Sequence, residues 1–224
     1  MVEPDGGARV APIDGGRPAA PRLYAPRTAE LATELLLRRP PGLGRTRLGV
    51  VDGPSGSGKS SFARLWASHL REKGLPEGGG LSGLLFSADL LATWADPFGW
   101  FDRFDAGVLQ PIADGHDGRI QLTDWTAGEP QPGAWMSIPV VDVLILEGVS
   151  SGRKALGDRV GVSVWLKTPG RSTRLEHAVA RDGESSRALL AAWQDAEDAF
   201  FEQDRPGNRA DFLVSPRHST WWKT

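Results

Sequence analysis

Hydrophobic residues along the chain occur in two kinds of pattern that alternate from residue 28 onward. Short continuous apolar runs predict buried strands, and they occupy residues 48–51, 84–86, 140–146, 160–166 and 212–214. Apolar residues spaced three or four apart predict helices, and these stretches cover residues 28–38, 59–71, 104–113, 171–181 and 184–203. Because strands that alternate with helices form a parallel sheet covered on both faces, the pattern predicts an α/β fold with a doubly wound parallel sheet of about five strands.

Two shorter apolar segments do not fit this alternation. Residues 120–122 and 135–138 flank a turn rich in Gly and Pro, which predicts an inserted β-hairpin. We expect the run at 48–51 to be the central strand, with the hairpin and a small lid of helices beside it.

Composition divides the chain into three parts. Residues 1–22 hold four Gly and four Pro with almost no large apolar side chain, so we predict a disordered leader there. Residues 23–46 are expected to form an N-terminal helix and a linker, since the two prolines at 40–41 end the helical pattern. Residues 47–224 are expected to form a single domain.

The turn after the predicted central strand carries the clearest chemical signal. Its sequence, GPSGSGKS, fits the phosphate-loop pattern G-x-x-x-x-G-K-[ST] in full. Glycines let backbone N–H groups turn inward around phosphates, and a helix beginning near Lys59 directs its positive end at the same anion. Lys59 would reach the β and γ phosphates as a point charge, and Ser60 would offer its hydroxyl to Mg²⁺. We therefore predict that the phosphates of a nucleotide and Mg²⁺ bind at Gly53, Pro54, Ser55, Gly56, Ser57, Gly58, Lys59, Ser60 and Ser61. The loop alone does not separate kinases, GTPases and transport ATPases.

Charge and composition exclude several other functions. Lys and Arg number 26 against 28 Asp and Glu, a net charge of −2, so no basic excess exists to bind nucleic acid. The chain has no cysteine, which excludes disulfides and thiolate chemistry and fits a reducing cytoplasm. The most apolar stretch, residues 81–104, contains three aspartates, so we expect no contact with a membrane and a cytoplasmic protein. Trp221 and Trp222 near the C-terminus either dock on a partner chain or cover the core, which leaves a homo-oligomer open.

Two carboxylates follow predicted strands. Asp89 comes after the run at 84–86, and Glu147 ends the run at 140–146. The carboxyl ends of parallel strands lie at the edge of the sheet that also holds the phosphate loop. Phosphoryl transfer to an alcohol needs one carboxylate beside the acceptor hydroxyl and another near Mg²⁺. The alternatives are a turn or helix N-cap role for Asp89 and a helix-start charge for Glu147.

The order of several short segments resembles a known family. The chain contains GPSGSGKS, Ser-Ala-Asp89, Phe-Asp102, Asp124-Trp125, Glu147-Gly148 and Arg181-Asp-Gly in that order. This order is similar to the uridine kinase and phosphoribulokinase group of P-loop kinases, and above all to its divergent uridine-kinase-like members in actinobacteria. The resemblance covers roughly residues 47–214.

The resemblance implies a role for each matching position. The Asp after the second strand orients and deprotonates the acceptor hydroxyl, the Glu supports Mg²⁺, the next Asp binds sugar hydroxyls, and the arginines belong to a lid over the phosphates. It thus assigns catalysis to Asp89, Lys59 and Arg181, metal binding to Ser60 and Glu147, and substrate binding to Asp102, Asp124, Trp125, Arg174 and Arg187.

The acceptor side departs from the family pattern. Leu90-Leu91-Ala92 follows Asp89 where uridine kinases have a polar residue and Phe-Tyr, and Thr123-Asp124-Trp125 replaces Tyr-Asp-Phe. Three functions therefore remain: a kinase of a nucleoside or sugar-like hydroxyl compound, a kinase of a secondary metabolite or antibiotic, and a nucleotide-binding regulatory module. The presence of both Asp89 and Glu147 argues against the regulatory module. We expect the first function, an ATP-dependent kinase of a small-molecule hydroxyl acceptor.

Overall fold

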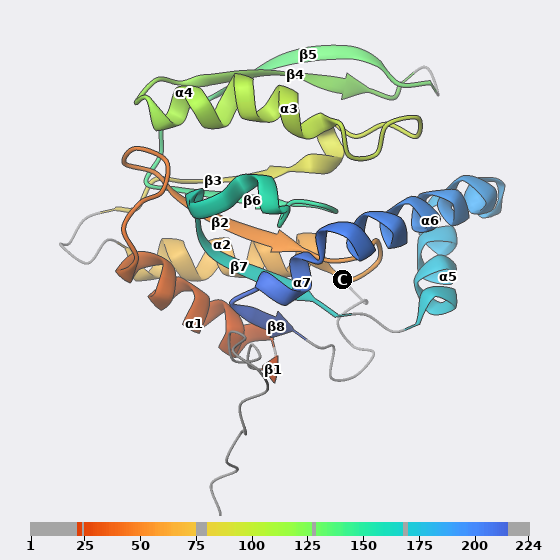
Figure 1. The fold of residues 1–224 in the computed structure, drawn as a ribbon, viewed down its shortest axis with the longest axis horizontal. Helices are drawn as coiled ribbons and strands as arrows, with labels where there is room; N and C mark the ends of the chain where they lie inside the picture. Colours follow the sequence, from red (N-terminus) through yellow and green to blue (C-terminus); the bar gives the residue numbers. More distant parts are fainter. Residues whose placement is uncertain (1–21, 24, 75–79, 127–128, 168–169, 215–224) are drawn as a thin grey trace, which may run out of the picture.

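The computed structural model describes residues 22–23, 25–74, 80–126, 129–167 and 170–214. Its centre is a parallel sheet with strand order β1-β8-β7-β2-β6-β3 (Figure 1). The strands are β1 (Arg22–Leu23), β2 (Arg47–Asp52), β3 (Gly83–Ser87), β6 (Val143–Glu147), β7 (Val160–Leu166) and β8 (Phe212–Val214). The predicted doubly wound sheet is confirmed, with β2 between β6 and β7.

The two ends of the described chain meet at one edge of the sheet. β1 is a two-residue strand that pairs in parallel with β8 and adds to the five predicted strands. Arg22, placed in the predicted leader, is therefore part of the sheet. Residues 1–21 and the Trp221-Trp222 pair lie outside the described residues.

Helices cover both faces of the sheet, as the pattern predicted. On one face, α1 (Ala25–Arg38) and α2 (Lys59–Lys73) contribute Leu36, Phe62 and Trp66 to a core with the sheet. These three side chains are fully buried, so the apolar stripe that predicted each helix is the face that packs.

A helical segment with a π-turn packs on the opposite face. It consists of α3 (Trp100–Phe104), the π-helix η2 (Asp105–Leu109) and α4 (Gln110–Ala113). The segment begins four residues before the predicted start, because Trp100 and Phe101 already face the core. Asp102, which precedes the predicted helix start at residue 104, is therefore on a helix.

The predicted hairpin is present and lies against this helical segment (Figure 1). It pairs β4 (Gly118–Asp124) with β5 (Gln131–Ile138) in antiparallel register. Ile120 and Ile138 point into the same core as the helical segment. Hairpin and helix together therefore form one wall beside the carboxyl end of β3.

A pair of helices follows the carboxyl end of β7 in the place predicted for a lid. α5 (Arg171–Asp182) and α6 (Arg187–Asp204) are joined by the short 3-10 helix η4 (Glu184–Ser186) and contact each other (Figure 1). The short helix α7 (Pro206–Arg209) leads from α6 into β8. Within the described ranges, no helix is both long enough and apolar enough to span a bilayer.

Candidate functional site

The phosphate loop joins the carboxyl end of β2 to the first residue of α2. Gly53, Gly56 and Gly58 have φ angles of 150°, 73° and 86°, values that favour glycine over any residue with a side chain. A Cβ on Gly56 would lie 3.4 Å from the carbonyl oxygen of Arg174, so α5 packs directly on the loop. The amino end of α2 then points at the space the loop encloses, as anion binding requires.

Lys59 and Ser60 occupy the positions expected of them. Lys59 is buried, and its Nζ donates a hydrogen bond of 3.1 Å to the carbonyl oxygen of Pro54 across the loop. Ser60 Oγ donates to Glu147 Oε1 over 3.1 Å. The predicted cation, hydroxyl and carboxylate are therefore in one place at the carboxyl edge of the sheet.

Glu147 has the chemistry of a magnesium ligand. It is the last residue of β6 and is buried, and its Oε2 atom makes no hydrogen bond with the described part of the chain. Burial raises the pKa of Glu147, while the charge of Lys59 acts against that rise. A free carboxylate oxygen beside the Ser60 hydroxyl fits Mg²⁺, which prefers oxygen ligands and keeps few from the protein.

The described residues contain no cluster of three or more His, Asp or Glu side chains that could hold a metal alone. A magnesium ion here would therefore complete its coordination with water and phosphate oxygens, as Mg²⁺ does in nucleotide sites.

Asp89 lies one turn beyond β3, beside the Glu147 strand. It belongs to the 3-10 helix η1 (Ala88–Leu90), and its side chain is exposed and makes no hydrogen bond or ion pair with the described residues. The charge of Asp89 contributes to the raised pKa of Glu147, so the two carboxylates are near each other. Gly148 keeps η1 close, because a Cβ there would lie 2.7 Å from the Cβ of Ala88.

The three lid arginines differ in where they point. Arg181, at the end of α5, bonds to Asp182, and this hydrogen bond raises the pKa of Arg181, with a smaller contribution from the charge of Asp89. The charge of Asp89 therefore acts on Arg181, so these two side chains are near each other. Arg187 is partly exposed and bound to Glu176 and Glu184, so this structure does not bring it to the phosphate loop.

Arg174 is buried behind the phosphate loop. Its guanidinium donates over 3.1 Å to Glu197 of α6, whose carboxylate in turn accepts the Ser55 backbone N–H. Its position fits a support for the loop better than a direct contact with substrate. Glu197 was not among the predicted residues.

The predicted acceptor residues lie on the wall formed by the hairpin and α3. Trp125 follows β4 and meets Trp94 edge to face, with ring centroids 6.0 Å apart. Asp124 accepts the Thr126 backbone N–H, which lowers the pKa of Asp124. Asp102 is exposed on α3.

Arg153, another residue that sequence reasoning missed, connects this wall to the loop after β6. Its guanidinium lies 4.9 Å from the ring centroid of Trp100 and 4.6 Å from that of Phe101, and it donates to the carbonyl oxygen of Phe98. Burial lowers the pKa of Arg153, and the charge of Asp102 is among those that oppose this. Since arginine keeps its charge in proteins, Arg153 places a fixed cation beneath the acceptor wall.

Asp52 is a second buried carboxylate that the sequence did not single out. It ends β2 and accepts backbone N–H groups from Gly53 at 2.6 Å, Ser150 at 3.0 Å and Gly152 at 2.8 Å. It thereby ties the start of the phosphate loop to the segment after Glu147. Burial raises the pKa of Asp52 to about 7, although these hydrogen bonds and the charge of Lys59 act against the rise.

Raising the pH from about 4 to about 7 is expected to lower the free energy of unfolding through Asp52 by up to about 4 kcal/mol. The pKa of Asp52 is 3.8 in the unfolded chain and about 7 in the folded one, so the folded protein holds the extra proton in this window. Stability therefore falls as the pH rises and changes no further above the folded pKa. Urea unfolding of wild type and of Asp52→Asn between pH 4 and pH 8 measures this effect. A difference between the two proteins that does not vary with pH would contradict it.

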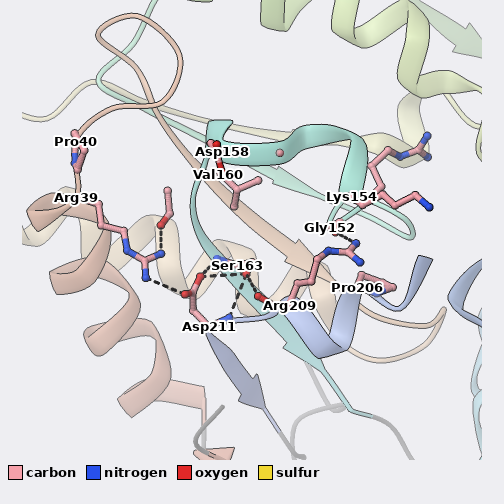
Figure 2. A pocket seen from close by; sticks show the side chains of 13 residues that line it. Arg39, Pro40, Gly152, Lys154, Asp158, Val160, Ser163, Pro206, Arg209 and Asp211 are labelled. Atoms are coloured by element: carbon pink, nitrogen blue, oxygen red, sulfur yellow. Dashed lines mark hydrogen bonds and ion pairs between the residues drawn. The ribbon is translucent and has the colours of Figure 1, made fainter. Parts of the chain in front are cut away.

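A cavity of about 530 Å³ lies away from the phosphate loop, between β7, α7 and the 3-10 helix η3 (Lys154–Arg159) (Figure 2). Its walls include Arg39 and Arg209, which bond to Asp211 and Asp204 and to backbone carbonyls. None of the residues predicted to bind nucleotide or acceptor lines it. The ion pairs of its wall serve the packing of α1 and α7 on the sheet.

Comparison with solved structures agrees with this architecture. A "possible uridine kinase" from Bacillus stearothermophilus superposes with a TM-score of 0.56 at 20% identity, covering 84% of this chain and 98% of that one. A proposed fructose transport system kinase from Silicibacter sp. TM1040 gives 0.52 at 20% identity, covering 87% and 100%. YFH7 from Saccharomyces cerevisiae, a proposed P-loop kinase with a circular permutation, gives 0.51 at 10% identity, covering 88% and 100%.

The sequence comparisons add nothing to these likenesses. No model of a protein family matches the chain, and no curated protein does. At 10–20% identity the structural likenesses show the fold alone, which is the α/β fold of P-loop proteins.

Proposed function

We propose that the protein is an ATP-dependent kinase that phosphorylates a hydroxyl group of a small molecule, a nucleoside or a sugar-like compound. One observation carries the proposal. The phosphate-loop residues Lys59 and Ser60 lie at the same sheet edge as Glu147, and Asp89 follows the neighbouring strand. A nucleotide-binding module without an acceptor would not need the second, exposed carboxylate. The fold likeness to proteins described as uridine and fructose transport system kinases supports this function.

On the nucleotide side, the residues of the chain bind and neutralise phosphate. Backbone N–H groups of the loop and the amino end of α2 would hold the phosphates, and Lys59 would offset the charge that develops on the γ-phosphoryl group. Ser60 and Glu147 would hold Mg²⁺. When bound, that ion draws charge from the phosphate oxygens.

On the acceptor side, Asp89 would orient the hydroxyl toward the γ phosphorus and take its proton. The new O–P bond then forms as the bond between the γ phosphorus and the β–γ bridging oxygen breaks. Because the transition state is loose, orientation contributes more than basicity. Arg181 would approach the transferring group when the lid closes.

The acceptor would rest on the wall beside Asp89. Trp94 and Trp125 present partly exposed rings there, which suits the flat face of a base or sugar. Asp102 would bind acceptor hydroxyls next to the one that reacts. Asp124 would stabilise the turn that carries Trp125. Because a kinase needs a steady supply of ATP, the proposal includes a cytoplasmic location.

A panel of nucleosides, sugars and related alcohols, each added with Mg·ATP, is expected to reveal at least one compound that stimulates ADP release. The phosphorylated product should then be detected by mass spectrometry in the same reaction. Tight ATP binding without stimulation by any acceptor would contradict the kinase proposal and indicate a regulatory nucleotide-binding module instead.

A further inference from the structure

Glu197 on α6 is a fully buried carboxylate in contact with the phosphate loop. Both of its oxygens lie within 3.0–3.1 Å of the Ser55 backbone nitrogen, and the Ser55 hydroxyl also donates to it. Arg174 donates to it over 3.1 Å and the indole nitrogen of Trp193 over 2.7 Å. Every partner is a donor, so the carboxylate is fully solvated by the protein.

A negative charge this close to a phosphate site needs a reason. An unpaired carboxylate behind the loop would repel the nucleotide, and burying it would be costly. Arg174 cancels the charge, and its side chain is nearly as buried as that of Glu197, with 6% and 0% exposed. Arg174 also lies 3.7 Å from Asp198, an exposed carboxylate that Arg171 binds as well. The Arg174–Glu197 pair contacts the loop through the backbone and hydroxyl of Ser55. The pair therefore fixes the path of the loop at Ser55.

Trp193 connects the same turn of α6 to the acceptor side. Its ring lies edge-on to Trp94, with centroids 5.5 Å apart, and also contacts Phe98. Trp94 and Phe98 belong to the segment between η1, which carries Asp89, and α3. Trp94 in turn touches Trp125 of the hairpin. A single helical turn thus contacts the phosphate loop through Glu197 and the acceptor segment through Trp193.

We propose that Glu197 is a positioning residue for the phosphate loop and that Trp193 couples its position to the acceptor segment. This inference rests on the proposed function and adds to it a link between the two half-sites. A shift of Trp94 as an acceptor settles against it moves the Trp193 ring. Because the indole N–H is hydrogen-bonded to Glu197, that movement shifts the Glu197 carboxylate. The shift changes the hydrogen bonds from Ser55 to Glu197 and with them the affinity of the phosphate loop for nucleotide.

A double-mutant cycle with a non-hydrolysable ATP analogue tests the coupling without any acceptor. Calorimetry with Mg·AMPPNP is expected to show about fivefold weaker binding for Trp94→Ala. A change of about this factor is typical when a change at one site alters the affinity of a second, coupled site. Glu197→Gln, which keeps the shape and removes the charge, should weaken binding by about tenfold. The double variant should bind no more weakly than Glu197→Gln alone. Trp135→Ala is the matched control, because this more exposed tryptophan lies on β5 over Arg119.

Hydrogen exchange at the Ser55 amide gives a second readout that needs no nucleotide. The amide should exchange faster in Glu197→Gln and in Trp94→Ala than in wild type, and at the wild-type rate in Trp135→Ala. Trp193→Phe keeps an aromatic ring and loses the indole N–H, so its Ser55 amide should exchange faster than in wild type, as in Trp94→Ala. This variant takes the place of Glu197→Gln if Glu197→Gln is unfolded at the temperature of the measurement.

Two results would overturn the coupling. One is that the effects of Trp94→Ala and Glu197→Gln on analogue affinity multiply independently. The other is that the exchange rate at Ser55 stays unchanged when Trp94 is removed. Neither readout involves phosphoryl transfer. An acceptor panel without any active compound would therefore contradict the kinase proposal, while analogue affinity and amide exchange would still test the coupling.

Discussion

Lys59→Ala is expected to lower the rate of acceptor-stimulated ADP release by at least about a hundredfold, because it removes a positive charge where negative charge develops in the transition state. Lys59 is buried against Pro54, and its charge acts on both Glu147 and Asp52. Steady-state kinetics with an acceptor found in the panel measures the loss.

Lys73→Ala is the control for this prediction. Lys73 is the last residue of the same helix and is exposed, so its removal changes the net charge equally without touching the loop. We expect near-wild-type ADP release from this control. Near-wild-type release from Lys59→Ala would mean that the loop does not bind the reacting phosphates.

Asp89→Asn is expected to bind Mg·ATP normally and to transfer phosphate at about 1% of the wild-type rate or less, within the range for a positioned acid–base group. The amide keeps the size of the side chain but replaces one acceptor oxygen with an NH2 donor. It therefore neither orients the hydroxyl as a carboxylate does nor takes its proton. Asp89 is exposed and its charge does not hold the fold together, so this variant should fold. Pre-steady-state kinetics separates binding of nucleotide from the chemical step.

Asp102→Asn provides the contrast on the acceptor side. A residue that binds neighbouring hydroxyls contributes equally to ground state and transition state, so this variant should mainly raise the acceptor KM. Asp114→Asn, at an exposed position just after α4, is the neutral control. Full activity of Asp89→Asn with a confirmed acceptor would end the acid–base assignment.

The sheet and the phosphate loop were predictable because both depend on local patterns. Continuous apolar runs predicted β7 and β8 with the bounds that the structure shows. The spacing of the glycines and the Lys-Ser pair after them predicted the phosphate loop. The start of α3 was missed because aspartates interrupt the apolar stretch around Trp100, although Trp100 and Phe101 face the core. Strand 140–146 was predicted too early, since β6 begins only at Val143.

The support behind the site could not be predicted, because its partners are distant in sequence. Glu197 stands among other charged residues of a helix, as an exposed residue would, and its contact with Ser55 spans 142 positions. Asp52 directly precedes the loop, and its burial depends on backbone groups about a hundred positions away. Arg187 was assigned to the lid from its place in the sequence. In the structure its guanidinium donates to Glu176 of α5 and does not reach the phosphate loop.

For the proposed kinase, the contact between Trp94 and Trp193 limits how freely the acceptor preference can be altered. A substitution at Trp94 that opens room for a bulkier alcohol also removes the ring against which Trp193 rests. Variants selected only for a new acceptor should therefore lose nucleotide affinity at the same time. Second substitutions that restore this affinity should occur on the face of α6 that carries Trp193 and Glu197. Laboratory evolution of acceptor range is then best begun at Trp125, whose described ring contact is with Trp94 and not with the lid helix.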